Sequence, residues 1–280
     1  MNEYVSYEDL KLYLRITDTD GDLQLMRFCE QASRTWDAGT RRKFYPQVGV
    51  YYYDYPYNPG VLVLTDDLLE VTSFTTQNTA ITLATGDYYL MCGTLYNVTP
   101  YDRIAMRIDG AWPTLSYNET PQCSNRIVGI WGYHEDWANA WQAVDTLAAG
   151  VTASATTLTV ADVDGAGLDG RTPRFKVQQI IKVGTEYMYV SAKVAGTTKS
   201  LTVQRGVNGS TAAIQAISAP VSVYKPMIDV AQKVQRLAAW LYGQKDQPYT
   251  ERIQAAQSGV ITIPDALPSD VRLGMMRYQR

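Results

Sequence analysis

The start of the fold is set by residues 6–16, which read Ser-Tyr-Glu-Asp-Leu-Lys-Leu-Tyr-Leu-Arg-Ile. Ser6 followed three positions later by Asp9 is the pattern of a helix N-cap, because the serine hydroxyl accepts from the free backbone amides of the first turn. An Asp-rich polar turn comes next, and apolar residues then recur at helical spacing up to Trp36. Residues 1–43 are therefore expected to form an N-terminal helical hairpin.

Two later segments have the pattern of β structure. Residues 44–130 hold short apolar runs separated by Gly, Pro, Asn and Asp, which predicts the strands and turns of a small β module. Residues 151–226 show strand patterns again, but they are rich in Thr, Ala, Gly and Val and poor in aromatic residues up to Tyr187. This change of composition indicates a second, inserted all-β domain that folds separately.

The remaining segments favour helix. Residues 131–150 contain a Trp- and Ala-rich stretch, and an apolar stripe runs from Ile228 to Leu241. A Pro followed by an acid at residues 268–270 predicts a last short helix. We expect residues 131–150 and 227–280 to complete a helical core. The predicted fold class is α+β, with N- and C-terminal helices that bracket the small β module and the inserted all-β domain.

Composition excludes several classes of protein. The chain has 28 acidic and 25 basic residues and a net charge of −3, so it is no basic scaffold for wrapping nucleic acid. No apolar run reaches the ~18 residues of a membrane span, and the N-terminus is acidic where a secretion signal is basic. The three cysteines are scattered, which favours free thiols over a disulfide framework. We expect a soluble, unprocessed protein.

Reactive and metal-binding residues are scarce. One His and three separated Cys supply no closed zinc site, and the chain has no Gly-x-Ser-x-Gly elbow. His134 is expected to face solvent in a polar turn. The loop at residues 165–170 matches the dinucleotide fingerprint, but a strand follows it where a helix is needed. The sequence therefore predicts no enzyme and no cofactor.

Two Asp-rich loops, at residues 18–22 and 162–169, offer oxygen ligands suited to Ca²⁺. Neither has the Gly and Glu positions of an EF-hand loop, and turn and capping roles explain both. No metal site is predicted, and the question of Ca²⁺ in these loops stays open at this point.

Tyrosine is the unusual aromatic residue here, with 21 Tyr against 4 Phe. Because the hydroxyl needs water or a partner, a Tyr-rich chain indicates many half-exposed rings, which protein interfaces favour. The densest run spans residues 51–57, and we expect it to pack against a neighbouring subunit. The alternatives are a stacking platform for sugars or bases and a cover for the chain's own β module. The predicted interface residues are Tyr51, Tyr52, Tyr53, Tyr55, Tyr57, Trp131, Trp137, Trp141, Arg277, Tyr278 and Arg280.

The densest basic cluster is Arg41, Arg42 and Lys43, which follows the predicted hairpin. Basic residues at the end of a helix are expected because they complement its dipole. The same three side chains are also the candidates for facing DNA, since Arg and Lys contact phosphates.

A set of helix, strand and turn patterns runs through most of the chain. It comprises the Tyr-Glu-Asp-Leu-Lys opening at residues 7–11, the Asp-x-Asp-x-Asp turn at 18–22, and residues 68–73, 88–90, 100–101, 129–133, 238–242 and 267–271. Together these patterns resemble the phage head-tail connector proteins, also called adaptors. Residues 201–213 are similar to a small β-domain segment of virion proteins, which usually ends in His where this chain has Gln215.

The resemblance implies a helical connector core and a homo-oligomeric ring, typically of twelve copies, docked under the portal protein. Double-stranded DNA would pass through the bore, and the lower face would receive the tail or a stopper protein. The protein would lie at the capsid–tail junction of the virion, and in the host cytoplasm during assembly, with no membrane partner. Simple family members are much shorter and mainly helical, so the two β modules are a departure. The alternative function is a carbohydrate-binding component of a tail or baseplate.

Overall fold

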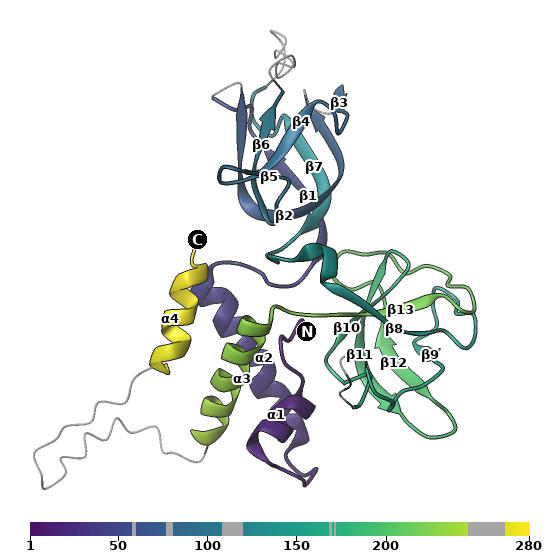
Figure 1. Ribbon diagram of the computed structural model, residues 1–280. Helices are drawn as coiled ribbons and strands as arrows, with labels where there is room; N and C mark the ends of the chain where they lie inside the picture. Colours follow the sequence, from purple (N-terminus) through teal and green to yellow (C-terminus); the bar gives the residue numbers. More distant parts are fainter. Residues whose placement is uncertain (58–59, 77–80, 108–119, 168–169, 171, 246–266) are drawn as a thin grey trace, which may run out of the picture. The chain divides into compact units, whose positions relative to one another are not determined.

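A computed structural model describes the chain apart from residues 58–59, 77–80, 108–119, 168–169, 171 and 246–266 (Figure 1). It divides into two compact units. The helical unit comprises Met1–Arg41, Lys176–Gln179 and Ile228–Arg280, and the β unit comprises Arg42–Phe175 and Ile180–Met227.

The fold is mostly β, so the predicted α+β class with a helical core is wrong. The described residues form thirteen strands in two antiparallel sheets and only four α-helices. The main error lies in residues 131–150. There the short 3-10 helix η1 (Trp137–Asn139) is followed by strand β8 (Trp141–Thr146). Trp, Val and Thr favour strands, and pairing with a distant strand outweighs the weak helix preference of the alanines.

Four helices, each expected from the sequence, build the helical unit: α1 (Tyr7–Leu14), α2 (Asp22–Thr40), α3 (Ile228–Gly243) and α4 (Ser269–Tyr278). The predicted N-cap is confirmed, because the Ser6 hydroxyl accepts from the Asp9 backbone N–H at 3.1 Å. Helices α2 and α3 pack as a central pair, and α1 and α4 each contact both of them. In Figure 1, α1 and α4 lie on opposite sides of that pair.

A short segment from the middle of the chain, Lys176–Gln179, belongs to the helical unit and is held by α1. Lys176 pairs with Asp9 at 2.6 Å. The buried Gln178 side chain accepts from the Tyr7 N–H at 3.0 Å and donates to the Met26 carbonyl at 3.0 Å. Nothing in the local sequence predicts this role, since its partners are more than 150 positions away.

The first sheet has the order β1-β7-β2-β6-β4-β5, with β3 paired to β2. Its strands are β1 (Gln47–Tyr53), β2 (Val61–Thr76), β3 (Ile81–Leu83), β4 (Tyr88–Cys92), β5 (Leu95–Tyr96), β6 (Tyr101–Met106) and β7 (Asn125–Trp131). Burial alternates along β7, with Ile127 and Trp131 inside and Val128 and Ile130 half-exposed. The inner face of this sheet is therefore built on the period of two that strands impose.

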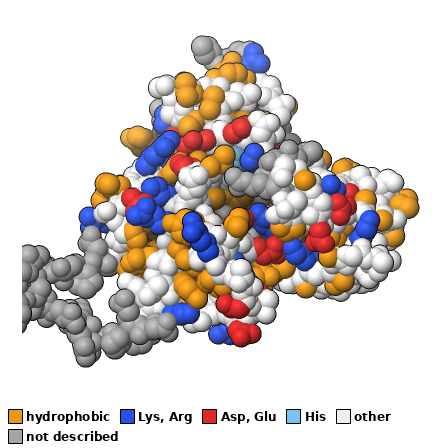
Figure 2. Space-filling view, turned by 60° about the horizontal axis from the view of Figure 1, so that its bottom comes forward, with side chains coloured by type: hydrophobic (Ala, Val, Ile, Leu, Met, Phe, Trp, Pro, Cys, Tyr) orange, Lys and Arg blue, Asp and Glu red, His pale blue; other side chains and the backbone are white. Residues whose placement is uncertain are grey.

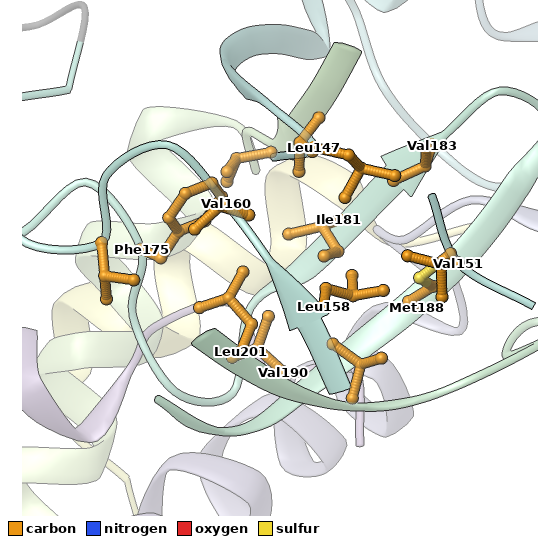
Figure 3. Close-up of a cluster of buried hydrophobic side chains, with 14 residues drawn as sticks. Leu147, Val151, Leu158, Val160, Phe175, Ile181, Val183, Met188, Val190 and Leu201 are labelled. Atoms are coloured by element: carbon orange, nitrogen blue, oxygen red, sulfur yellow. The ribbon is translucent and has the colours of Figure 1, made fainter. Parts of the chain in front are cut away.

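The second sheet has the order β8-β13-β10-β11-β12-β9. Besides β8, it contains β9 (Thr157–Thr159), β10 (Ile180–Val183), β11 (Glu186–Val194), β12 (Ser200–Gln204) and β13 (Pro220–Tyr224). A β-bridge between Leu147 and Val160 brings its two edges together. Figure 3 shows the enclosed apolar side chains pointing toward one another, with Leu158 and Ile181 near the centre. The sequence boundary at residue 151 thus cuts through this sheet, because β8 lies before it.

The two sheets of the β unit share an aromatic junction. We give this name to the cluster of Ala140, Ile180, Tyr187, Val207 and Tyr224 with Tyr45, Val48, Trp137, Trp141 and Tyr189 packed against it. Backbone contacts reinforce it: the Tyr224 hydroxyl donates to the Phe44 carbonyl at 2.8 Å, and the Val48 N–H donates to the Asn208 carbonyl at 2.8 Å. These groups therefore connect the two sheets within the β unit.

Candidate interaction surfaces

The tyrosine run divides between the two faces of β1 and the loop that follows. Tyr53 is buried and Tyr51 and Tyr55 are partly buried, all in the core of the first sheet. Tyr51 stacks on Trp131 with ring centroids 4.0 Å apart. Burial raises the pKa of both Tyr51 and Tyr53. Tyr52 is 56% exposed and Tyr57 is fully exposed. Three of the five predicted interface tyrosines thus cover the chain's own β module, and two remain open.

The three predicted interface tryptophans also pack within the β unit. Trp131 is only 2% exposed, and its indole N–H donates to the Gly49 carbonyl at 3.2 Å. Trp137 and Trp141 pack against the aromatic junction. Trp141 stacks on Tyr187 at 5.1 Å. Their packing roles show that aromatic content alone does not locate an outer surface.

Trp141 also carries a cation contact. The Lys182 ammonium lies 4.8 Å from the centre of its ring. Burial lowers the pKa of Lys182. The indole therefore shields one face of this lysine from water.

His134 does not face solvent as predicted, because it is buried. Its Nδ1 accepts from the Asp136 backbone N–H at 3.1 Å, which assigns the ring proton to Nε2. Nε2 then donates to the Lys225 carbonyl at 3.1 Å. Burial lowers the pKa of His134, because it penalises the charged imidazolium. Both ring nitrogens therefore make hydrogen bonds. Together these bonds hold the segment before β8 next to the end of β13.

The three residues of the predicted basic cluster have different surroundings. The Arg42 guanidinium donates to the buried Asp67 carboxylate and lies 4.7 Å from the centre of the Tyr133 ring. Arg41 is exposed and ends α2 in the left-handed conformation, with a φ of 56°. Lys43 is exposed and donates to the Gln47 side chain at 3.0 Å. Of the three candidates for facing DNA, Arg42 has its charge balanced within the protein, whereas Arg41 and Lys43 reach solvent.

The C-terminal residues are anchored by α3 and α2. Tyr278 is buried, and its hydroxyl donates to the Asp229 carboxylate. Arg277 is exposed and lies 3.8 Å from the same carboxylate. The Arg280 backbone N–H donates to the Thr40 carbonyl at 3.1 Å, and its side chain is exposed. Of the three predicted contact residues, the two arginines present charge to solvent and the tyrosine packs inside.

Large apolar side chains are exposed on the helical unit. Leu12 on α1 is 80% exposed, and Leu273 on α4 is 64% exposed. Among the described residues of this unit, the exposed large apolar side chains are Met1, Leu12, Tyr13, Leu23, Ile228, Leu273 and Met276. Figure 2 shows hydrophobic side chains scattered among charged ones on the face in view.

Residues 201–213 contribute to a buried ion pair within the second sheet. Glu186 is fully buried and accepts from Arg205 at 2.6 and 2.7 Å and from the backbone N–H groups of Gly206 and Ala213, each at 3.1 Å. Gln215, at the position where the similar segments have His, approaches the same carboxylate at 3.4 Å. Burial alone would raise the pKa of Glu186, but the bonds from Arg205 and the two amides outweigh it and lower the pKa. The motif therefore has a structural role.

The Asp-rich loops form no metal site in the described part of the chain, where no cluster of three His, Cys, Asp or Glu side chains is suitably placed. Arg174 lies 3.6 Å from Asp145 and 3.7 Å from Asp162. Asp169, the last acid of the second loop, falls outside the described residues. Asp162 of the second loop thus lies near Arg174, and its side chain accepts from the Asp164 backbone N–H at 3.3 Å.

Comparison with known protein families finds no matching family model, and comparison with curated proteins finds no significant match. Within the described ranges, none of the helices combines the length and the hydropathy that a membrane crossing requires.

Proposed function

We propose that this protein is a structural, non-enzymatic virion protein: a head-tail connector that forms a ring, typically of twelve copies, between the portal and the tail or a stopper. Double-stranded DNA passes through the bore of this ring. The protein then resides at the capsid–tail junction, and in the host cytoplasm during assembly.

The observation that carries the proposal is the helical unit itself. Helices from both ends of the chain pack into one body that exposes large apolar residues on α1 and α4. The segments that resemble connectors at residues 7–11, 238–242 and 267–271 fall on or next to α1, α3 and α4. A packed unit whose outer helices keep apolar side chains in water is suited to assembly, because burying them between copies removes apolar area from water.

Charge supports passage of DNA without tight binding. The chain carries a net charge of −3, and one arginine of its densest basic cluster is paired with Asp67. An acidic ring attracts few phosphates, so DNA slides through it instead of being retained.

The carbohydrate-binding alternative has less support. A stacking platform for sugars needs open ring faces, but Tyr51 is covered by Trp131, and Tyr53 is buried. Only Tyr52 and Tyr57 of the run remain available, and they are exposed singly. We therefore do not propose a glycan site.

The mass of the full-length protein, measured by native mass spectrometry alone and after mixing with portal rings, tests the proposal. We expect a closed oligomer in solution or, if assembly requires the portal, a complex in which each portal ring carries a full set of copies. An unrelated ring-forming protein of similar size serves as the control for non-specific binding. A protein that stays monomeric and never binds portal rings would refute the proposal.

A further inference from the structure

The helical unit carries exposed apolar side chains on its two opposite sides, and the charges around them differ in sign. We define the α1 flank as Leu12, Tyr13, Asp18, Asp20 and Leu23, and the α4 flank as Arg272, Leu273, Met276 and Arg277. All nine residues are exposed. Because α1 and α4 contact the central α2–α3 pair from opposite sides, the two flanks of one molecule cannot meet each other (Figure 1).

The α4 flank is a single face of its helix. Its members occupy positions i, i+1, i+4 and i+5, which neighbour one another on a helix surface, whereas Val271, Met275 and Tyr278 point into the unit. The nearby acid Asp270 is already neutralised, since Lys233 and Arg236 each lie 3.1 Å from it. Arg277 lies 3.8 Å from Asp229, whereas Arg272 makes no ion pair among the described residues. The flank therefore presents the apolar side chains of Leu273 and Met276 beside two arginines, one of which is partly balanced.

The α1 flank has the opposite balance. Asp18 and Asp20 are exposed in the turn between α1 and α2, and neither side chain makes an ion pair among the described residues. The one lysine that reaches this turn, Lys11, is engaged by the Asp18 carbonyl and by Asp22. Arg15 is the single exposed base between the two helices, so the acids outnumber it. Farther along α2, Glu30 pairs with the N-terminal ammonium at 2.7 Å, and Arg27 is a second exposed base.

We propose that the α1 flank of one copy binds the α4 flank of the next copy, so that the helical units assemble head to tail. The proposal rests on the ring of the proposed function and names the two surfaces that form it. We expect the occupant to be a second copy of the chain, because each chain carries both flanks. Each flank has exposed apolar side chains, the charges beside them differ in sign, and the two flanks cannot contact each other within one molecule. Two different faces that bind each other form a heterologous contact, which repeats until the ring closes.

Two sets of substitutions, each confined to exposed side chains, separate the flanks. Variant A carries Asp18→Arg and Asp20→Arg, and variant B carries Arg272→Glu and Arg277→Glu. We expect each variant alone to associate at least about tenfold more weakly than the unchanged protein, because like charges then face each other. A chain with all four substitutions restores opposite charges and is expected to recover assembly. Circular dichroism and thermal unfolding verify that every variant keeps its fold.

A second experiment replaces the apolar side chains of each flank and distinguishes a head-to-tail contact from a two-fold contact. Variant C carries Leu12→Glu and Leu23→Glu, and variant D carries Leu273→Glu and Met276→Glu. In a head-to-tail contact, C keeps a working α4 flank and D keeps a working α1 flank. Each is therefore expected to be monomeric alone, whereas an equal mixture forms a one-to-one dimer that grows no further.

The matched control is Val63→Glu, since Val63 is 66% exposed and lies on β2 of the β unit, outside both flanks as defined. We expect it to assemble like the unchanged protein. The readout is native mass spectrometry alone and on portal rings. A homodimer of C or of D would overturn the proposal in favour of a two-fold contact, and full assembly of either would show that the flanks are not the interface. If the unchanged protein neither oligomerises nor binds portal rings, the proposed function itself fails, which is a separate result.

Discussion

The first prediction concerns Gly209 of the β unit, which packs against Val48 of the aromatic junction. Gly209 has a φ of +77°, and a Cβ built there would lie 2.1 Å from the Val48 carbonyl oxygen. Gly196 has nearly the same backbone, with a φ of +79°, but nothing lies within 4 Å of its Cβ position. Gly209→Ala and Gly196→Ala therefore share the strain of a left-handed alanine, roughly 1–2 kcal/mol. Only the first also forces the loop off β1.

The additional cost follows from what the loop must release. It loses the hydrogen bond from the Val48 N–H to the Asn208 carbonyl, about 1 kcal/mol. It also uncovers part of the buried Val207 side chain, whose complete burial stabilises by about 1.5–3 kcal/mol. We expect Gly209→Ala to lower the free energy of unfolding by about 2–3 kcal/mol more than Gly196→Ala.

Urea denaturation of the full-length protein, followed by tryptophan fluorescence, measures this difference. Hydrogen exchange gives the local readout, because the Val48 amide should exchange faster in Gly209→Ala and at the unchanged rate in Gly196→Ala. Equal destabilisation by the two substitutions, with an unchanged Val48 amide, would refute the packing of this loop against β1.

Three further predictions concern buried groups of the β unit. Glu186→Gln should cost about 3–5 kcal/mol in urea denaturation at pH 7, because Arg205 keeps a buried charge without its carboxylate. The native pKa of Glu186 lies below the ordinary 4.5, so the stability that its ionised form contributes is complete above pH 4.5 and decreases as the pH falls further. A difference in unfolding free energy between the unchanged protein and Glu186→Gln that does not vary with pH would contradict this. His134 is the one His of the chain and its native pKa is lowered, so stability should fall as the pH drops below 6.5, and His134→Asn should remove that slope. Trp131→Ala should cost about 3–5 kcal/mol in thermal or urea unfolding, whereas Tyr52→Ala, on the outer face, should stay within about 0.5 kcal/mol.

Local signals were sufficient to predict the helices. Ser6 caps α1 through its own neighbour Asp9, and the apolar stripe of α3 is complete within one helix, so short-range patterns carry the information. The tyrosine run also held a readable signal, because Tyr51, Tyr53 and Tyr55 alternate with period two and point to one face. The sequence did not show whether that face packs into the core or against a partner. The position of Trp131 in the structure shows that it packs into the core.

Long-range pairing accounts for the failures. Strand β8 is fixed by its register with β13, where Trp141 lies opposite Tyr224, and no window around residue 141 contains that partner. His134 donates a hydrogen bond to the carbonyl of Lys225, which is 91 positions away in the sequence. The exposed flanks were missed for a different reason: Leu12 looks like core beside Leu10 and Leu14, and only the packing of α1 shows that it points outward.

The segment Lys176–Gln179 has a consequence for the order in which the chain is made. The helical unit needs α1 and α2 from the start of the sequence, this segment from its middle, and α3 and α4 after residue 227. The β unit is complete by Met227, so during synthesis it can fold before the helices that precede it find their partners. Until α3 and α4 emerge, α1 and α2 have each other and the segment around Gln178 to pack against. The helical unit, which carries both proposed flanks, can therefore be completed only after the residues of the β unit have been made.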